Sequence, residues 1–191
     1  DSFFVYREST QQGVYTKIAS QEASAFSTFI DATANPQQRA HRYALSLLVT
    51  CGFESLQSNP HKTIHLTINA GMGGAWNLIW DQYEGFGYLS YYILRGNSPN
   101  NLSDLDSIQS SLTSYTDLSP PAGPLFYAVE VRKPTPCTPS ARIASNYFVS
   151  SRSNVKDVIG VNIGSISEPV YGIEIIPNPT NAKTEMTFIL N

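Results

Sequence analysis

Ser2-Phe3-Phe4-Val5-Tyr6-Arg7, a short run near the start of the chain, recurs as Ser90-Tyr91-Tyr92-Ile93-Leu94-Arg95. The segments after each copy are also alike and follow in the same order. They are Phe29-Ile30-Asp31 and Tyr115-Thr116-Asp117, then residues 41–49 and 125–131, then Cys51 and Cys137. Landmarks that recur in one order at a nearly constant offset indicate one structural unit used twice. A repeated unit is more typical of a spacer or binding module than of an enzyme.

The composition favours small extracellular β-domains. The 191 residues have room for one to two domains, and the repeat favours two small modules over one core. Charged residues make up 14% and aromatic residues 12% of the chain, whereas an average soluble domain has roughly 25% charged residues. The net charge is −3 and Lys and Arg form no cluster, so we expect no nucleic-acid partner. No apolar run approaches the roughly 18 to 20 residues of a membrane-spanning helix.

Alternating patterns predict the strands. Such patterns, bounded by Gly, Pro, Asn and Ser clusters at spacings of about 8 to 15 residues, are typical of a sandwich or a barrel. In the second copy, Trp76, Leu78 and Trp80 share one face of a strand and predict a core face. Further strands are predicted there at 91–95, 127–131 and 146–155. In the first copy they are predicted at 3–7, 15–19, 28–31, 42–49 and 61–68.

The first copy has no counterpart of the tryptophan-bearing strand at 76–80. We therefore expect this module to lack its first two strands, which leaves an unpaired edge and an open core. The chain then reads as an internal or processed piece, with those strands upstream of Asp1 or supplied by another chain. Residues 71–74, Gly-Met-Gly-Gly, join two predicted strands rather than opening a helix, so they cannot cradle phosphate. We expect them to form a flexible joint between the modules.

These landmarks resemble the fibronectin type III-like modules, which are immunoglobulin-like β-sandwiches. The tryptophan of the family's second strand is matched by Trp80, and the tyrosine of its sixth strand by Tyr43 and Tyr127. The resemblance implies that all three are structural core residues, with the tyrosine hydroxyls bonding to backbone at a corner. It implies tandem all-β sandwiches, a partial module at 1–69 and a full one at 70–160. Residues 61–96 look more specifically like surface proteins of the Bacteroidetes.

The tail at 171–181, Tyr-Gly-Ile-Glu-Ile-Ile-Pro-Asn-Pro-Thr-Asn, resembles the opening of the C-terminal sorting domain read by the type IX secretion system. Pro177, Asn178 and Pro179 match the turn that ends the first strand of that domain, and 183–190 would form the next strand. Residues 161–191 are therefore expected to be a linker and the start of a sorting domain. The resemblance implies a secreted, surface-attached protein with the secretion machinery as a partner, although such domains normally run for several further strands.

Residues with catalytic or metal-binding chemistry are sparse. His41, His61 and His65 show no metal-ligand spacing with Cys or Asp, and the last two would lie about 13 Å apart on a strand. Asp104 and Asp106 lack the glycine and terminal glutamate of a calcium loop, which favours a solvated turn. We expect no enzyme activity, no cofactor and no metal.

The two cysteines do not form an obvious framework. Cys51 and Cys137 occupy equivalent places in the two copies, about one module length apart. A disulfide between them would need Cα atoms within about 7 Å. We expect both to be free or to pair with residues outside this sequence.

Three hypotheses for the function remain open, the last of which is direct binding of a glycan by the modules. Tyr83, Phe86, Tyr88 and Tyr91 cluster in sequence, and an exposed aromatic patch could bind a glycan through Tyr83 and Phe86, although about half of these rings should pack in the sheet. The first hypothesis is a set of non-catalytic spacer or adhesion modules with a surface glycan or protein as ligand. The second is a set of accessory modules of a large secreted hydrolase, a peptidase or a glycoside hydrolase, whose catalytic domain lies upstream.

Overall fold

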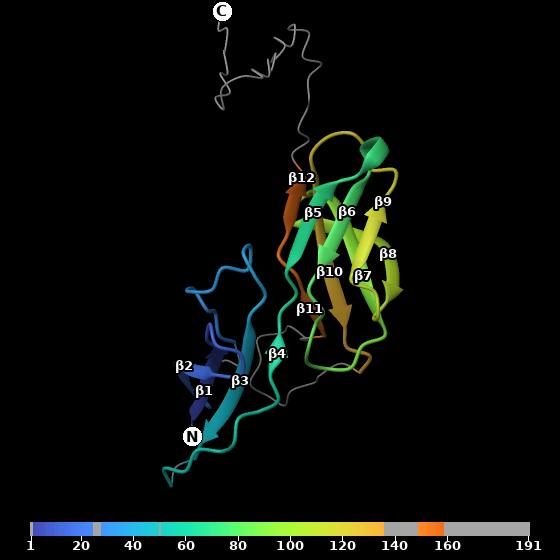
Figure 1. The fold of residues 1–191 in the computed structure, drawn as a ribbon. Coiled ribbons are helices and arrows are strands. Elements are labelled where there is room, and N and C mark those ends of the chain that lie inside the picture. The colour runs from blue at the N-terminus through green and yellow to red at the C-terminus, as the bar shows by residue number, and fades with distance from the viewer. Residues whose placement is uncertain (1, 25–27, 50, 136–148, 159–191) are drawn as a thin grey trace, which may run out of the picture. The chain divides into compact units, whose positions relative to one another are not determined.

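The computed structural model describes residues 2–24, 28–49, 51–135 and 149–158 (Figure 1). These residues form antiparallel β-sheets and one short 3₁₀ turn, η1 (Met72–Gly74). The strands are β1 (Ser2–Glu8), β2 (Tyr15–Glu22), β3 (Arg42–Leu48), β4 (His61–Lys62), β5 (Leu66–Ala70), β6 (Trp76–Trp80), β7 (Ser90–Ser98), β8 (Asn101–Gln109), β9 (Ser114–Asp117), β10 (Leu125–Arg132), β11 (Ser150–Arg152) and β12 (Lys156–Val158). The all-β class expected from the sequence is therefore confirmed.

The first copy forms a sheet that we call the open sheet, with the strand order β2-β1-β3-β4. β1 runs antiparallel to β3, with Arg7 opposite Tyr43 and Val5 opposite Leu45. On its other side β1 pairs with β2, and the register shifts at a bulge between Val5 and Tyr6. The strands predicted at 3–7, 15–19 and 42–49 are all present in this sheet.

The second copy forms the covered sheet, with the order β11-β10-β7-β8 and β12 also paired to β10. Arg95 lies opposite Tyr127 and Ile93 opposite Val129, in the same register as their counterparts in the open sheet. The bulge also recurs, between Ile93 and Leu94 where β7 pairs with β8. The sequence repeat is therefore a repeat of strand pairing.

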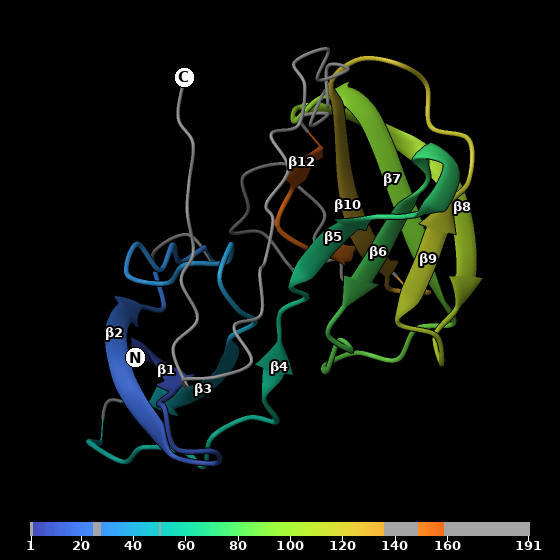
Figure 2. The ribbon, with the colours of Figure 1, turned by 45° about the horizontal axis from the view of Figure 1, so that its top comes forward.

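A three-stranded covering sheet, β5-β6-β9, packs on the covered sheet and gives the second copy its sandwich-like core. Figure 2 shows β5, β6 and β9 as one layer, with β7, β8 and β10 as the layer behind it. Leu78 and Trp80 of β6 are buried, and the Trp80 ring meets Tyr91 edge-on with centroids 5.3 Å apart. The core face predicted on this strand is confirmed, because Ile79 between them points outward and is exposed.

The predicted strand at 61–68 is divided between two sheets. β4 pairs with β3 in the open sheet, whereas β5 pairs with β6 in the covering sheet. The boundary expected between residues 69 and 70 therefore falls inside β5. The joint expected at 71–74 is a tight connection from β5 to β6, closed by a hydrogen bond of 2.8 Å from the Gly71 N–H to the Ala75 carbonyl. Gly73 and Gly74 adopt positive φ in this turn, which glycine does at low cost.

Three further expectations are corrected. Residues 28–31 are not a strand, because their counterpart β9 pairs only with β6 and the described part of the first copy has no strand equivalent to β6. Asp104 and Asp106 lie inside β8 rather than in a turn. The predicted strand at 146–155 is interrupted after β11, which ends at Arg152.

Several predictions fall outside the residues that the structure describes. They concern Cys137, the tail at 161–191 and its Pro177, Asn178 and Pro179. Cys51 is a free, exposed thiol. No helix in the described residues is long and apolar enough to cross a membrane.

Candidate functional site

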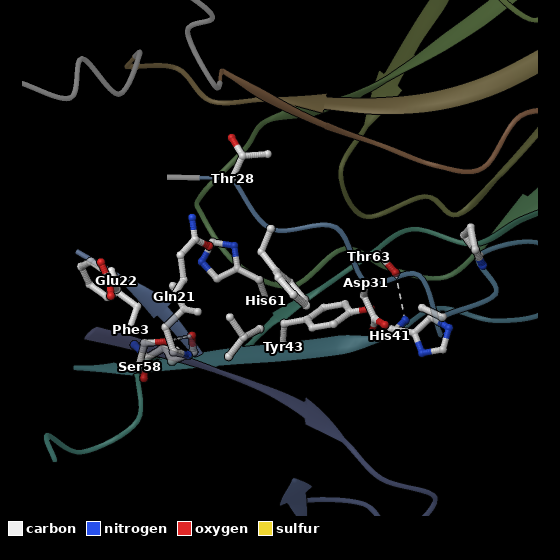
Figure 3. A pocket seen from close by; sticks show the side chains of 16 residues that line it. Phe3, Gln21, Glu22, Thr28, Asp31, His41, Tyr43, Ser58, His61 and Thr63 are labelled. Carbon is white, nitrogen blue, oxygen red and sulfur yellow. Dashed lines mark hydrogen bonds between the residues drawn. The ribbon is translucent and has the colours of Figure 1, made fainter. Parts of the chain in front are cut away.

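A hollow of about 870 Å³ lies over one face of the open sheet and is the candidate site. β1 contributes Phe3 and Val5 to it, β3 contributes Tyr43 and Leu45, and the segments at 28–36 and 58–63 form its walls. Figure 3 shows the Tyr43 ring in the middle of this group with its hydroxyl directed toward Asp31. The floor is therefore apolar and the charged group lies at one end.

The floor of the hollow corresponds, position by position, to the core of the second copy. Phe3 and Leu45 are 41% and 46% exposed, whereas their counterparts Tyr91 and Val129 are 0% exposed. The paired strands have the same register, so the difference does not come from the sheets themselves. It comes from the covering sheet, which β5, β6 and β9 supply to the second copy and which has no equivalent among the described residues of the first.

Asp31 is the centre of a polar group at the end of the hollow. Arg7 Nη1 donates to Asp31 Oδ2 at 2.7 Å and the Tyr43 hydroxyl donates to the same oxygen at 3.0 Å. The Thr33 amide donates to Oδ1 at 3.0 Å, and its hydroxyl donates there too. We call this arrangement an Arg–Asp–Tyr cluster.

The second copy contains the same cluster. Arg95 Nη1 donates to Asp117 Oδ2 at 2.6 Å, and the Tyr127 hydroxyl donates to it at 2.7 Å. The Ser119 amide donates to Oδ1 at 3.2 Å, as the Thr33 amide does in the first copy. The tyrosine hydroxyls therefore bind a carboxylate, whereas the family resemblance implied a backbone partner.

Both carboxyl groups ionise more readily than usual. Burial raises the pKa of Asp31, but the hydrogen bonds from Thr33, Tyr43 and Arg7 outweigh burial and lower the pKa to about 2. The same balance lowers the pKa of Asp117, with Tyr127, Arg95 and the Ser119 amide as donors. Burial, followed by the carboxylate, raises the pKa of Tyr43 to about 12. The carboxylates stay charged and the tyrosines stay protonated at neutral pH, as a structural ion pair requires.

The three histidines have different hydrogen-bond partners, although His41 and His61 both line the hollow. His41 is buried at the edge of the hollow, its backbone exchanges hydrogen bonds with Thr63, and burial lowers its ring pKa. His61 lies 3.2 Å from the Tyr83 hydroxyl, and His65 lies 3.1 Å from the Gln37 carbonyl. Within the described ranges, no three His, Cys, Asp or Glu side chains are grouped so that they could hold a metal ion.

Of the two aromatic residues considered for glycan binding, Tyr83 packs inward and Phe86 is half-buried. Tyr83 is only 5% exposed and belongs to the core of the second copy. Its ring centroid lies 4.9 Å from Phe86 and 5.6 Å from Tyr88, and its amide donates to the Tyr91 hydroxyl. The ring face of Tyr83 is therefore covered by other rings, and the expected exposed patch does not form around it.

A Ser–Asn pair that strand alternation does not reveal recurs beside the two sheets. Ser153 Oγ accepts from the Val129 amide at 2.9 Å and donates to the Asn154 carbonyl. Ser58 Oγ likewise accepts from the Leu45 amide at 3.1 Å and donates to the Asn59 carbonyl. In the sequence, this pair is visible only as the recurring dipeptides Ser58-Asn59 and Ser153-Asn154.

Comparison of the chain with known protein families, curated proteins and solved structures finds no significant match.

Proposed function

We propose that the chain belongs to the non-catalytic spacer or adhesion modules of a type IX-secreted surface protein, built from fibronectin type III-like units. The observation that carries this proposal is the repetition of the whole unit, including strand register, bulge and Arg–Asp–Tyr cluster. In both clusters the charged atoms are bound to each other. A polar group that is satisfied internally and used twice supports a role in holding the fold.

The connection between the two copies suits a spacer. Arg42 of β3 donates from Nε and Nη2 to the Glu84 carboxylate, at 2.9 and 2.5 Å, and from Nη1 to Glu8 at 3.0 Å. The Lys62 amide also donates to the Glu84 carbonyl at 2.8 Å. A bidentate Arg–carboxylate pair fixes orientation as well as distance. These contacts tie the open sheet to the segment before β7 and favour a stiff rather than a freely hinged array.

Surface attachment is the part of the proposal that rests on the tail. To test it, the chain is expressed behind an export leader in a bacterium with a type IX system. The amount of the chain on the cell surface is then measured with an antibody. We expect surface display, and we expect its loss when Pro177, Asn178 and Pro179 are replaced by alanine. Equal display of the variant, or no display of either chain, would contradict the sorting role.

Accessory modules of a large secreted hydrolase are the alternative, with catalysis upstream of Asp1. The same rigid repeat would then hold a catalytic domain at a distance from the cell. The exposed apolar floor at Phe3 and Leu45 favours further polypeptide next to the first copy in either case. A catalytic motif in the preceding part of the reading frame would support the hydrolase, whereas further repeats of this unit would support the spacer.

A further inference from the structure

We propose that the hollow over the open sheet seats two antiparallel β-strands that precede β1 in the same polypeptide, and that Asn59 holds the backbone of the first of them. The strands would carry apolar side chains at alternate positions, as β5 and β6 do. The proposal concerns a partner of the open sheet and goes beyond the spacer function.

The second copy supplies the template for this partner. β5 and β6 come directly before β7 in the chain, and only residues 81–89 lie between β6 and β7. Leu66, Leu78 and Trp80 of these strands cover the positions whose counterparts are exposed in the open sheet. Since β1 is the counterpart of β7, chain order places the equivalent strand pair on the N-terminal side of Ser2.

The segment equivalent to the third covering strand is present in the chain but is not a strand, and it has no strand partner in the described part. β9 pairs with β6 from Ser114 to Asp117, and its counterpart is residues 28–31. Phe29, which lines the hollow, is 41% exposed and Ile30 is 81% exposed. A strand seated beside them would complete their backbone hydrogen bonds and convert this segment into the equivalent of β9.

Asn59 can form a specific contact with the backbone of a strand bound in the hollow. In the second copy, Asn154 is buried and clamps Leu66 of β5, accepting from its amide at 2.7 Å and donating to its carbonyl at 3.1 Å. Asn59 has the same Ser neighbour with the same hydrogen bonds to the sheet. Its own side chain is exposed, lines the hollow and has no hydrogen-bond partner among the described residues. The side-chain amide of asparagine has both a donor and an acceptor, which can bind the C=O and the N–H of one residue in an extended backbone.

The floor of the hollow fits the apolar side chains of a strand, although polar side chains such as Glu22 and His61 also line it. Its floor is formed by Phe3, Val5, Tyr43 and Leu45, and burying an unpaired polar group against such a floor costs free energy. The charged atoms of Arg7 and Asp31 are already paired with each other. Backbone hydrogen bonds to an edge strand and apolar side chains in alternate pockets are the usual basis of strand addition.

The test compares the chain beginning at Asp1 with one extended N-terminally along its own reading frame by a stretch as long as residues 64–89. Hydrogen exchange and the fluorescence of the apolar dye ANS are measured for both. We expect extension to slow the exchange of residues 28–31 and to abolish dye binding that depends on Phe3 and Leu45. The proposal fails if the reading frame has no such stretch, or if the extension leaves exchange and dye binding unchanged.

Asn59→Ala and Asn154→Ala form a matched pair. Asn154→Ala should destabilise the second copy in both chains. Asn59→Ala should be neutral in the chain beginning at Asp1, but should speed exchange at 28–31 in the extended chain by about tenfold, as expected when buried backbone hydrogen bonds are lost. A neutral Asn59→Ala in the extended chain would overturn the role of Asn59.

The competing outcome is that a second molecule of this chain covers the hollow. If the chain beginning at Asp1 becomes protected at 28–31 as its concentration rises, with a dimer seen by sedimentation, a second copy covers the hollow. That result would overturn the proposal that the strands come from the same polypeptide.

Discussion

Tyr43 and Tyr127 are the same residue type in the same position of two units, but only Tyr127 is enclosed on all sides. Tyr127→Phe removes the hydroxyl that donates to the Asp117 carboxylate and should lower the free energy of unfolding by about 1.5 to 3 kcal/mol. Tyr43→Phe, the matched control, should cost less because the hollow admits water to Asp31. Urea unfolding of both variants measures this difference, and equal costs would contradict the contrast in burial.

The Arg–Asp–Tyr clusters also predict how stability depends on acid. The folded pKa of Asp31, about 2, lies below the unfolded value of about 3.9, so the unfolded chain binds the proton first as the pH falls. The stability contributed by Asp31 is complete above the unfolded pKa and is lost as the pH falls through about 2. Asp117 acts in the same direction. Urea melts between about pH 5 and pH 2 should show this loss, and Asp117→Asn should reduce the slope.

His41 predicts a second pH dependence at higher pH. Burial lowers its folded pKa below the unfolded value of about 6.5, so stability should fall as the pH drops from about 6.5 through the folded value. Its counterpart in the covered sheet is Leu125, a core residue. His41→Leu should therefore remove this slope and stabilise the open sheet at pH 5.5, as followed by thermal melts at pH 5.5 and 7.5. An unchanged slope would show that His41 is not the titrating group.

Strand alternation predicted the burial of Trp80 and Tyr127 but not that of Tyr83, and it did not predict what the polar atoms of these residues bind. Trp80 and Tyr127 follow from strand alternation, because burial of every second side chain is a local property. The partner of the Tyr127 hydroxyl lies on β9, which belongs to the other sheet. Such a contact depends on how two sheets are packed, and strand alternation carries no information about that packing.

Among the elements, β6 is the most direct test of the core. Trp80→Ala should destabilise the second copy by about 3 to 5 kcal/mol, as large-to-small core substitutions do, since the ring packs on Tyr91 in the core. Ile79→Ala on the same strand, with its side chain exposed, should cost well under half of that. Guanidinium unfolding of the two variants provides the comparison. A neutral Trp80→Ala would rule out the core built between the covering and covered sheets.

The elements that the sequence misplaced share one cause, which is pairing between segments distant in the chain. Residues 61–68 alternate without a visible break, yet Thr63 is bound by the backbone of His41 and separates β4 from β5. Residues 28–31 have the pattern of a strand but no partner strand in the described part of the first copy. Strand propensity is a local property, whereas strand formation needs a neighbour to complete the backbone hydrogen bonds.

In the molecule as a whole, one β-unit occurs twice, with its core covered in the second copy and open in the first. Matching register, bulge, Arg–Asp–Tyr cluster and Ser–Asn pair support the repeat. The contrast between Leu45 and Val129 in exposure supports the difference.

Residue-resolved amide hydrogen exchange on the chain of 191 residues compares the two copies at matched positions. We predict that Val5 and Leu45 exchange faster than their register-matched counterparts, Ile93 and Val129, because strands with one face open to solvent unfold locally at lower free energy. Equal protection of the two pairs would contradict it, because it would show that the first sheet is as fully covered as the second.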